Sequence, residues 1–184
     1  MRLNWLPNAI CIARAVLVGP IVVALLGENY TVALALIGLA GFSDALDGML
    51  ARNFNWRTRM GGVLDPAADK LMVFSVFISL TYLELVPVFL AVLVISRDLI
   101  IIVGAMTYQF LIEPVEGEPA FISKLNTGVQ LLFMMVTLMS AAFHWPLSGF
   151  LLILGAIVIF TSITSGLNYV IGWSRRAWLK THLS

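Results

Sequence analysis

The sequence predicts an all-α membrane protein with six transmembrane helices, and three observations support this prediction. Of its 184 residues, 60% are hydrophobic and only 11% are charged, a composition typical of membrane proteins rather than soluble domains. The apolar residues gather in long runs, and a helix needs about 20 such residues to cross a bilayer. Short polar connectors separate the runs. We therefore expect a single polytopic domain over residues 1–184.

The predicted spans can be placed one after another along the chain. Glycine, proline or charged residues end each apolar run, as expected where a helix stops. The last two spans come from one uncharged stretch, which a His-Trp-Pro turn divides, since proline and interfacial tryptophan suit a helix end. The six spans are Ala9–Leu26, Tyr30–Leu50, Leu64–Leu83, Val86–Ile112, Ser123–Phe143 and Leu147–Trp173.

The charges in the connectors predict the orientation, because lysine and arginine concentrate on the cytoplasmic side of a membrane. The connectors that carry Glu28, Glu84 and His144 hold no lysine or arginine. Both termini should therefore face the cytoplasm, and we expect a multi-pass protein of a bacterial inner membrane. A net charge of +1 argues against a nucleic-acid partner. The basic residues on the inside are Arg2, Arg14, Arg52, Arg57, Arg59, Lys124, Arg175, Arg176 and Lys180.

Two pairs of aspartates mark the candidate active site on the cytoplasmic side. Asp44 and Asp47 are three residues apart, and Asp65 and Asp69 are four apart, so each pair lies on one face of a helix. Four carboxylates in a low-dielectric site need a counter-charge, which hard divalent cations supply. Two such cations with arginines nearby form a phosphoryl-transfer apparatus, in which one carboxylate could act as general base.

Small residues and one arginine accompany these aspartates. Gly48 follows Asp47, and Gly61 opens the next helix. Glycine is unfavourable in a helix interior, so each has a reason to be there: close helix packing, or room for a ligand beside the metals. Arg52 could bind a phosphate or extend its charge to the membrane surface.

The central stretch resembles the signature of the CDP-alcohol phosphotransferase family, which it matches without a gap. The pattern is Asp, two residues, Asp-Gly, two residues, Ala-Arg, eight residues, Gly, three residues, Asp, three residues, Asp. The resemblance implies two Mg²⁺ or Mn²⁺ ions on the aspartates, Asp69 as catalytic base, and a homodimer. The matching residues are Asp44, Asp47, Gly48, Ala51, Arg52, Gly61, Asp65 and Asp69.

The resemblance also implies a binding site for a CDP-linked donor, CDP-diacylglycerol. The Pro7-Asn8 pair before the first span is similar to the family's amino-terminal segment, where a short interfacial helix lies along the membrane. The implied donor-binding residues are Asn8, Asp47, Gly48, Ala51, Arg52 and Gly61.

Two further polar patches suggest where the acceptor binds. Arg97 lies inside the fourth span and Lys124 opens the fifth. Ionisable residues within a membrane span indicate function, so Arg97 is a candidate for binding an acceptor phosphate, with Lys124 as a second cation. Asp98 follows Arg97 directly, and we expect their side chains to diverge on the helix.

Both patches, residues 95–98 and 121–130, resemble the cardiolipin synthases of the mitochondrial type within this family. Phosphatidylglycerophosphate synthases are similar too, but typically have a second lysine where Asn126 stands. A phosphate monoester carries nearly two charges and benefits from extra cations, whereas a phosphodiester carries one. The resemblance therefore favours phosphatidylglycerol as acceptor, bound by Arg97, Lys124 and Asn126, with cardiolipin and CMP as products. The alternative is a CDP-diacylglycerol–glycerol-3-phosphate 3-phosphatidyltransferase.

Two other classes of protein remain open. A divalent-cation transporter would use the aspartates, but it gives no reason for Gly48, Arg52 and Gly61 at these spacings. A cation path lined by arginines would also repel its own substrate. A non-catalytic scaffold has no need to retain every position of the signature. Metal-dependent release of CMP from CDP-diacylglycerol distinguishes the enzyme from both.

Overall fold

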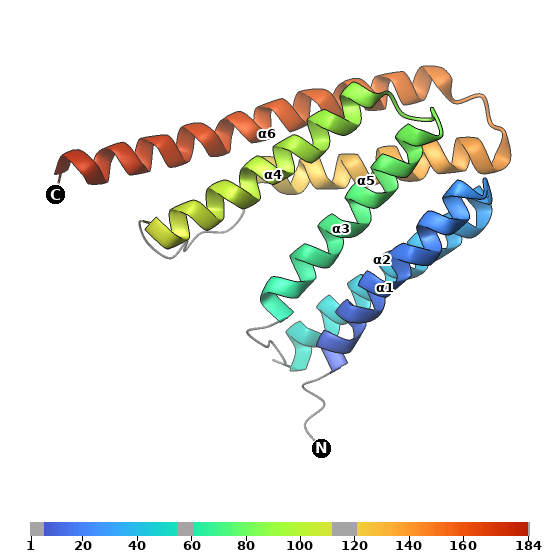
Figure 1. Cartoon of the computed structure of the whole chain (residues 1–184), viewed down its shortest axis with the longest axis horizontal. Coiled ribbons are helices and arrows are strands. Elements are labelled where there is room, and N and C mark those ends of the chain that lie inside the picture. Colours follow the sequence, from blue (N-terminus) through green and yellow to red (C-terminus); the bar gives the residue numbers. More distant parts are fainter. Residues whose placement is uncertain (1–5, 55–60, 112–120, 184) are drawn as a thin grey trace. The chain divides into compact units, whose positions relative to one another are not determined.

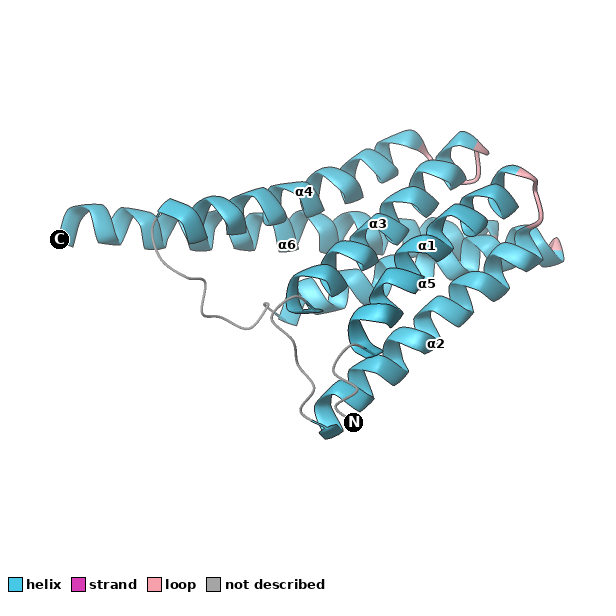
Figure 2. Ribbon diagram, turned by 60° about the horizontal axis from the view of Figure 1, so that its bottom comes forward, coloured by secondary structure: helices cyan, strands magenta, loops and turns pink. Residues whose placement is uncertain are grey.

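The described chain consists of helices joined by short connections. The computed structural model describes the backbone of residues 6–54, 61–111 and 121–183, and the side chains of residues 12–43, 70–104 and 121–172. These parts contain no strand (Figure 2), which confirms the all-α prediction. The described backbone forms six helices: α1 Leu6–Leu26, α2 Tyr30–Phe54, α3 Gly61–Tyr82, α4 Val88–Leu111, α5 Phe121–Phe143 and α6 Ser148–Leu183.

Each helix contains most of its predicted span, and the differences lie at the ends. α1 begins at Leu6, so Pro7 and Asn8, expected ahead of the first helix, lie in its first turn. Proline is accepted there because the first N–H groups of a helix have no intrahelical acceptor. α2 continues through Arg52, and α6 runs to Leu183 rather than ending at Trp173. The predicted spans are shorter because they were placed by hydropathy, which detects only the apolar length that fits a bilayer. The helix itself can continue into the polar sequence that follows.

Among the residues whose side chains are described, two helices have the length and composition needed to cross a membrane: α5, and α6 as far as Gly172. Over the described part of α6, most exposed side chains are apolar, and Leu152, Phe160 and Ile171 are strongly exposed. The same helix buries Thr161 and Ser165. Apolar side chains facing outwards and polar side chains facing inwards are the arrangement expected of helices in lipid.

The chain divides into two compact units, residues 1–86 with 134–146, and residues 87–133 with 147–184. In the first unit, α1 packs against both α2 and α3 (Figure 1). The buried face of α1 is formed by Arg14, Val18, Ile21 and Leu25, which are spaced as one stripe of a helix. Arg14 is only 2% exposed. The sequence places Arg14 among the basic residues of the cytoplasmic side, and the structure shows that its side chain belongs to the packed face of α1.

In the second unit α4 packs against α6, and the first half of α5 joins them (Figure 1). One end of this unit has an apolar core. A Cβ atom placed on Gly155 of α6 would lie 3.5 Å from Leu90 Cδ1 of α4 and 3.6 Å from Phe133 Cε2 of α5. Gly155 therefore marks a close approach of three helices, as small residues do in membrane proteins.

Gly155 provides a test of this packing. We expect Gly155→Ala to be tolerated, because an added Cβ stands at ordinary contact distance from its neighbours. Gly155→Leu should destabilise the protein by about 1–3 kcal/mol, because it overpacks the core. The thermal midpoint of the detergent-solubilised protein measures the change. Gly149→Leu is the matched control, since a Cβ there meets no atom within 4 Å, and an equal fall in both leucine variants would contradict the packing.

The turns that end α1, α3 and α5 share one backbone feature. Glu28, Glu84 and His144 have φ angles of 56°, 60° and 53°, in the left-handed region that commonly ends helices. After α1, the Asn29 N–H donates to the Ala24 carbonyl at 2.9 Å, the bond that closes a Schellman cap. Each of these tight turns lies in a connector that the charge pattern assigns to the outer side.

Candidate functional site

The four signature aspartates lie on two helices of the first unit. Asp44 and Asp47 belong to α2, and Asp65 and Asp69 belong to α3, so the helical spacing assumed for each pair is present in the backbone. Six residues, 55–60, join the end of α2 to the start of α3. Both helices pack against α1. The aspartates therefore occupy helix segments that are connected closely along the chain.

The side chains of this stretch lie outside the described residues. This holds for the metal and donor positions alike: Asn8, Asp44, Asp47, Gly48, Ala51, Arg52, Gly61, Asp65 and Asp69. Elsewhere, where side chains are described, no group of three or more His, Cys, Asp or Glu could hold a metal ion. The metal site and donor site remain predictions from the signature.

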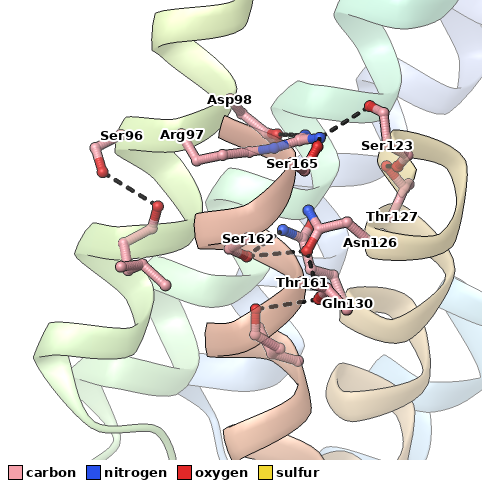
Figure 3. Close-up of polar contacts among 12 residues, drawn as sticks. Ser96, Arg97, Asp98, Ser123, Asn126, Thr127, Gln130, Thr161, Ser162 and Ser165 are labelled. Atoms are coloured by element: carbon pink, nitrogen blue, oxygen red, sulfur yellow. Dashed lines mark hydrogen bonds and ion pairs between the residues drawn. The ribbon is translucent and has the colours of Figure 1, made fainter. Parts of the chain in front are cut away.

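The second unit contains a buried cluster of polar side chains, which we call the polar core (Figure 3). It lies between α4, the beginning of α5 and the middle of α6. Three of the sequence-predicted positions fall in or beside it: Arg97 and Asn126 are buried, whereas Lys124 is exposed. The polar core consists of Arg97, Asp98, Ser123, Asn126, Gln130, Thr161, Ser162 and Ser165.

Arg97 is the centre of the first half of the polar core. Its side chain is 6% exposed, and its guanidinium reaches residues on α5 and α6 as well as α4 (Figure 3). Nη1 donates to Asp98 Oδ1 at 2.5 Å. Nη2 donates to Ser123 Oγ at 2.8 Å and to Ser165 Oγ. A carboxylate and two hydroxyls thus hold one buried cation.

The expectation that Arg97 and Asp98 diverge is wrong. Their Cα–Cβ bonds do point in different directions on the helix. The arginine side chain is long, however, and its planar guanidinium lies at the end of a flexible stem. In a buried site the attraction between opposite charges is strong, so the guanidinium turns back to the carboxylate beside it. The pair neutralises a charge inside the unit.

Asn126 organises the second half of the polar core. It is fully buried, and its Oδ1 accepts hydrogen bonds from Thr161 Oγ at 2.8 Å and Ser162 Oγ at 3.0 Å. One turn further along α5, Gln130 Nε2 donates to Ser162 Oγ at 3.5 Å. These bonds join α5 to α6. Asn126, which the sequence predicts as an acceptor-binding residue, therefore links two helices in the structure.

Three polar atoms of the polar core have no hydrogen-bond partner among the described residues: Arg97 Nε, Asn126 Nδ2 and Gln130 Oε1. A buried polar atom left unsatisfied costs about 1–3 kcal/mol. Such atoms are uncommon in folded proteins, and they often mark a functional position or a bound molecule. The polar core can therefore offer two donor nitrogens and one acceptor oxygen to a polar ligand.

Sequence reasoning missed most of the polar core. It identified Arg97, Lys124 and Asn126 but assigned no role to Ser123 or Gln130, although both lie in the patch over residues 121–130. A signal was present, since Ser123, Asn126 and Gln130 recur at helical spacing in an apolar run. The polar residues of α6 were harder to recognise from the sequence. A serine or threonine hydroxyl in a membrane helix can donate its hydrogen bond to a carbonyl of the preceding turn, so it needs no partner on another helix.

The comparisons with known proteins identify the family. The sequence model of the CDP-alcohol phosphatidyltransferase family matches residues 4–164, a region that includes the signature aspartates, the whole of α4 and α5, and the α6 hydroxyls Thr161 and Ser162. The chain belongs to the CDP-alcohol phosphatidyltransferase family. The resemblance expected from the signature is confirmed.

The individual relatives fall into two activities. The chain is 33% identical to the human cardiolipin synthase (CMP-forming), over 89% of this chain and 60% of that protein. It is 35% identical to the CDP-diacylglycerol–glycerol-3-phosphate 3-phosphatidyltransferase of Aquifex aeolicus, over 73% of each chain. It is also 32% identical to the probable phosphatidylglycerophosphate synthase of Mycobacterium tuberculosis, over 92% of this chain and 81% of that protein. The aligned part is about three-fifths of the length of the human cardiolipin synthase.

Proposed function

We propose that this chain is a membrane-embedded phosphatidyltransferase that uses CDP-diacylglycerol as donor and phosphatidylglycerol as acceptor, giving cardiolipin and CMP. The observation that carries the proposal is the unbroken signature from Asp44 to Asp69, placed on α2 and α3 within the region that matches the family. The cardiolipin synthases among the relatives support a lipid acceptor.

The aspartates suit a pair of divalent metal ions. All four offer carboxylate oxygens, the ligands that Mg²⁺ and Mn²⁺ prefer, and each pair occupies helical backbone at a spacing that shares one face. Two such ions, bound there, would neutralise the donor pyrophosphate and the departing CMP. We assign Asp44, Asp47, Asp65 and Asp69 as the metal ligands.

In the proposed reaction Asp69 is also the catalytic base. Its carboxylate takes the proton from the acceptor hydroxyl, whose oxygen forms a bond to the phosphorus that carries diacylglycerol. The bond from this phosphorus to the bridging oxygen of CMP breaks, and CMP leaves with the electron pair. Gly48, Ala51 and Gly61 leave space for the donor, and Arg52 pairs with its pyrophosphate. Asn8, in the first turn of α1, completes the donor site.

The choice of acceptor rests on the charge of the α4–α5 patch. Arg97 and Lys124 are the cations proposed to bind the acceptor phosphate, while Asn126 is neutral and bonds to Thr161 and Ser162. Asp98 already compensates the charge of Arg97. A patch with a small net positive charge suits the single negative charge of a phosphodiester better than the nearly double negative charge of a monoester.

A second acceptor is supported by two of the relatives. The protein of Aquifex aeolicus is named for glycerol-3-phosphate, and that of Mycobacterium tuberculosis for phosphatidylglycerophosphate synthesis. With this acceptor the chemistry at the donor phosphorus is unchanged, and the product is phosphatidylglycerophosphate.

We further propose that the active protein is a homodimer that crosses the membrane six times per chain, with both termini in the cytoplasm of a bacterial cell. Two spans have direct support from length and composition. The absence of lysine and arginine from the connectors around Glu28, Glu84 and His144 supports the orientation.

Product analysis tests the function. Purified protein in detergent would receive CDP-diacylglycerol and Mn²⁺ or Mg²⁺, with phosphatidylglycerol and glycerol-3-phosphate in separate reactions. We expect CMP release and cardiolipin with phosphatidylglycerol, and no lipid product after chelation of the metal. Phosphatidylglycerophosphate formed instead would select the second acceptor. If CMP is released with neither acceptor, the proposed function is contradicted.

A further inference from the structure

Arg97 is held in one orientation by groups from three helices (Figure 3). Asp98 of α4 accepts a hydrogen bond from Nη1, and Ser123 of α5 and Ser165 of α6 accept hydrogen bonds from Nη2. The stem of the side chain is also confined, since a Cβ placed on Gly166 of α6 would lie 3.6 Å from Arg97 Cγ. An arginine side chain that is free in solution loses considerable rotamer entropy when it is fixed. Here the fold has already fixed it.

The hydrogen bonds of the guanidinium leave one edge incomplete. A guanidinium has five N–H donors. Asp98 uses one on Nη1, and the two serines use both on Nη2. The Nε–H is buried and meets no acceptor among the described residues. If Arg97 served only a structural ion pair, each of its N–H groups would be expected to have an acceptor, because burying an unsatisfied donor destabilises the folded protein.

We propose that Asp98, Ser123 and Ser165 are positioning residues, which aim the unpartnered Nε–H of Arg97 at the phosphate of a glycerol-phosphate acceptor. This inference deepens the proposed function and rests on it. Fixing the guanidinium beforehand lowers the entropic cost of binding the acceptor. It also limits the orientations that the bound acceptor phosphate can take, which favours reaction.

Steady-state kinetics of Asp98 variants test the positioning role. With Asp98→Asn, the guanidinium loses a charge-assisted bond, and we expect the KM for the acceptor to rise about tenfold or more. The KM for CDP-diacylglycerol should stay within about twofold of the wild-type value, because the acceptor site alone is disturbed. Asp98→Glu keeps the charge and should recover part of the acceptor affinity.

Variants of the two serines and of Arg97 extend the kinetic test. Ser123→Ala and Ser165→Ala should raise the acceptor KM by smaller factors than Asp98→Asn. Ser96→Ala is the matched control, because the exposed Ser96 hydroxyl donates to the Leu93 carbonyl of its own helix, at 3.1 Å, and to no other described residue. If Asp98 acts through Arg97, then Asp98→Asn should have no further effect on acceptor KM in an Arg97→Lys background.

The outcomes are separable. Wild-type activity together with an unchanged acceptor KM in Asp98→Asn would overturn the positioning role and leave the proposed function intact. Equal changes in the donor and acceptor KM values would also overturn it, since they indicate a general loss of structure. A wild-type protein that releases no CMP with phosphatidylglycerol or glycerol-3-phosphate would overturn the proposed function, and this inference with it.

Discussion

Asp69→Asn should abolish phosphatidyl transfer while the protein still folds and still binds its donor. An asparagine cannot accept the proton of the acceptor hydroxyl, and positioned general bases contribute between about a hundredfold and ten-thousandfold in rate. The amide keeps one oxygen of the carboxylate and nearly its shape. CMP release and lipid products measure transfer, and equilibrium binding of CDP-diacylglycerol in the presence of Mn²⁺ measures the donor site.

The control for Asp69→Asn is Glu84→Gln, which removes a carboxylate from an exposed turn after α3. This variant should transfer at the wild-type rate. If Asp69→Asn loses donor binding together with transfer, Asp69 is chiefly a metal ligand. If it retains full transfer, another group is the base and the role assigned to Asp69 is wrong.

Arg97→Met should destabilise the protein and should also abolish transfer of the phosphatidyl group to the acceptor. The substitution leaves the buried Asp98 without its guanidinium partner, and breaking a buried ion pair by removing one member costs about 3–5 kcal/mol. The double variant Arg97→Met/Asp98→Leu replaces the whole pair with apolar side chains, which is often neutral or stabilising. We therefore expect the double variant to recover much of the lost stability, but no transfer.

The thermal midpoint in detergent and the rate of CMP release measure these two effects separately. The Ser96→Ala variant, one residue from Arg97 and exposed, controls for substitution on this part of α4. A double variant as unstable as Arg97→Met would show that the bonds to Ser123 and Ser165, rather than the buried charge, account for the stability. Transfer at the wild-type acceptor KM in Arg97→Met would exclude Arg97 from the acceptor site.

The helices and the family were predictable because both depend on patterns that are local in the chain. Apolar runs gave the six helices to within a few residues at most ends, and the largest error was α6, which extends to Leu183. The signature from Asp44 to Asp69 covers fewer than thirty residues. Its spacing identifies the family without any knowledge of how the helices pack.

The surroundings of Arg97 were not predictable in the same way. The sequence pointed to Arg97 because a charge inside a span is unusual. Its partners Ser123 and Ser165 lie 26 and 68 residues further along the chain. Whether such residues meet depends on the rotation of each helix about its axis, and a span that is apolar on all sides contains little information about that rotation.

Composition and apolar length by themselves predicted an all-α chain, and the resemblance of the sequence signature predicted the CDP-alcohol phosphatidyltransferase family, which the family model confirms. Only the tertiary structure decided that Arg97 turns back to Asp98, that hydroxyls of α5 and α6 also accept its hydrogen bonds, and that Arg14 is buried. The physical reason is that a buried charge takes its partner from whatever the packed helices bring within hydrogen-bond distance. That proximity is a property of the packed helices rather than of any one segment.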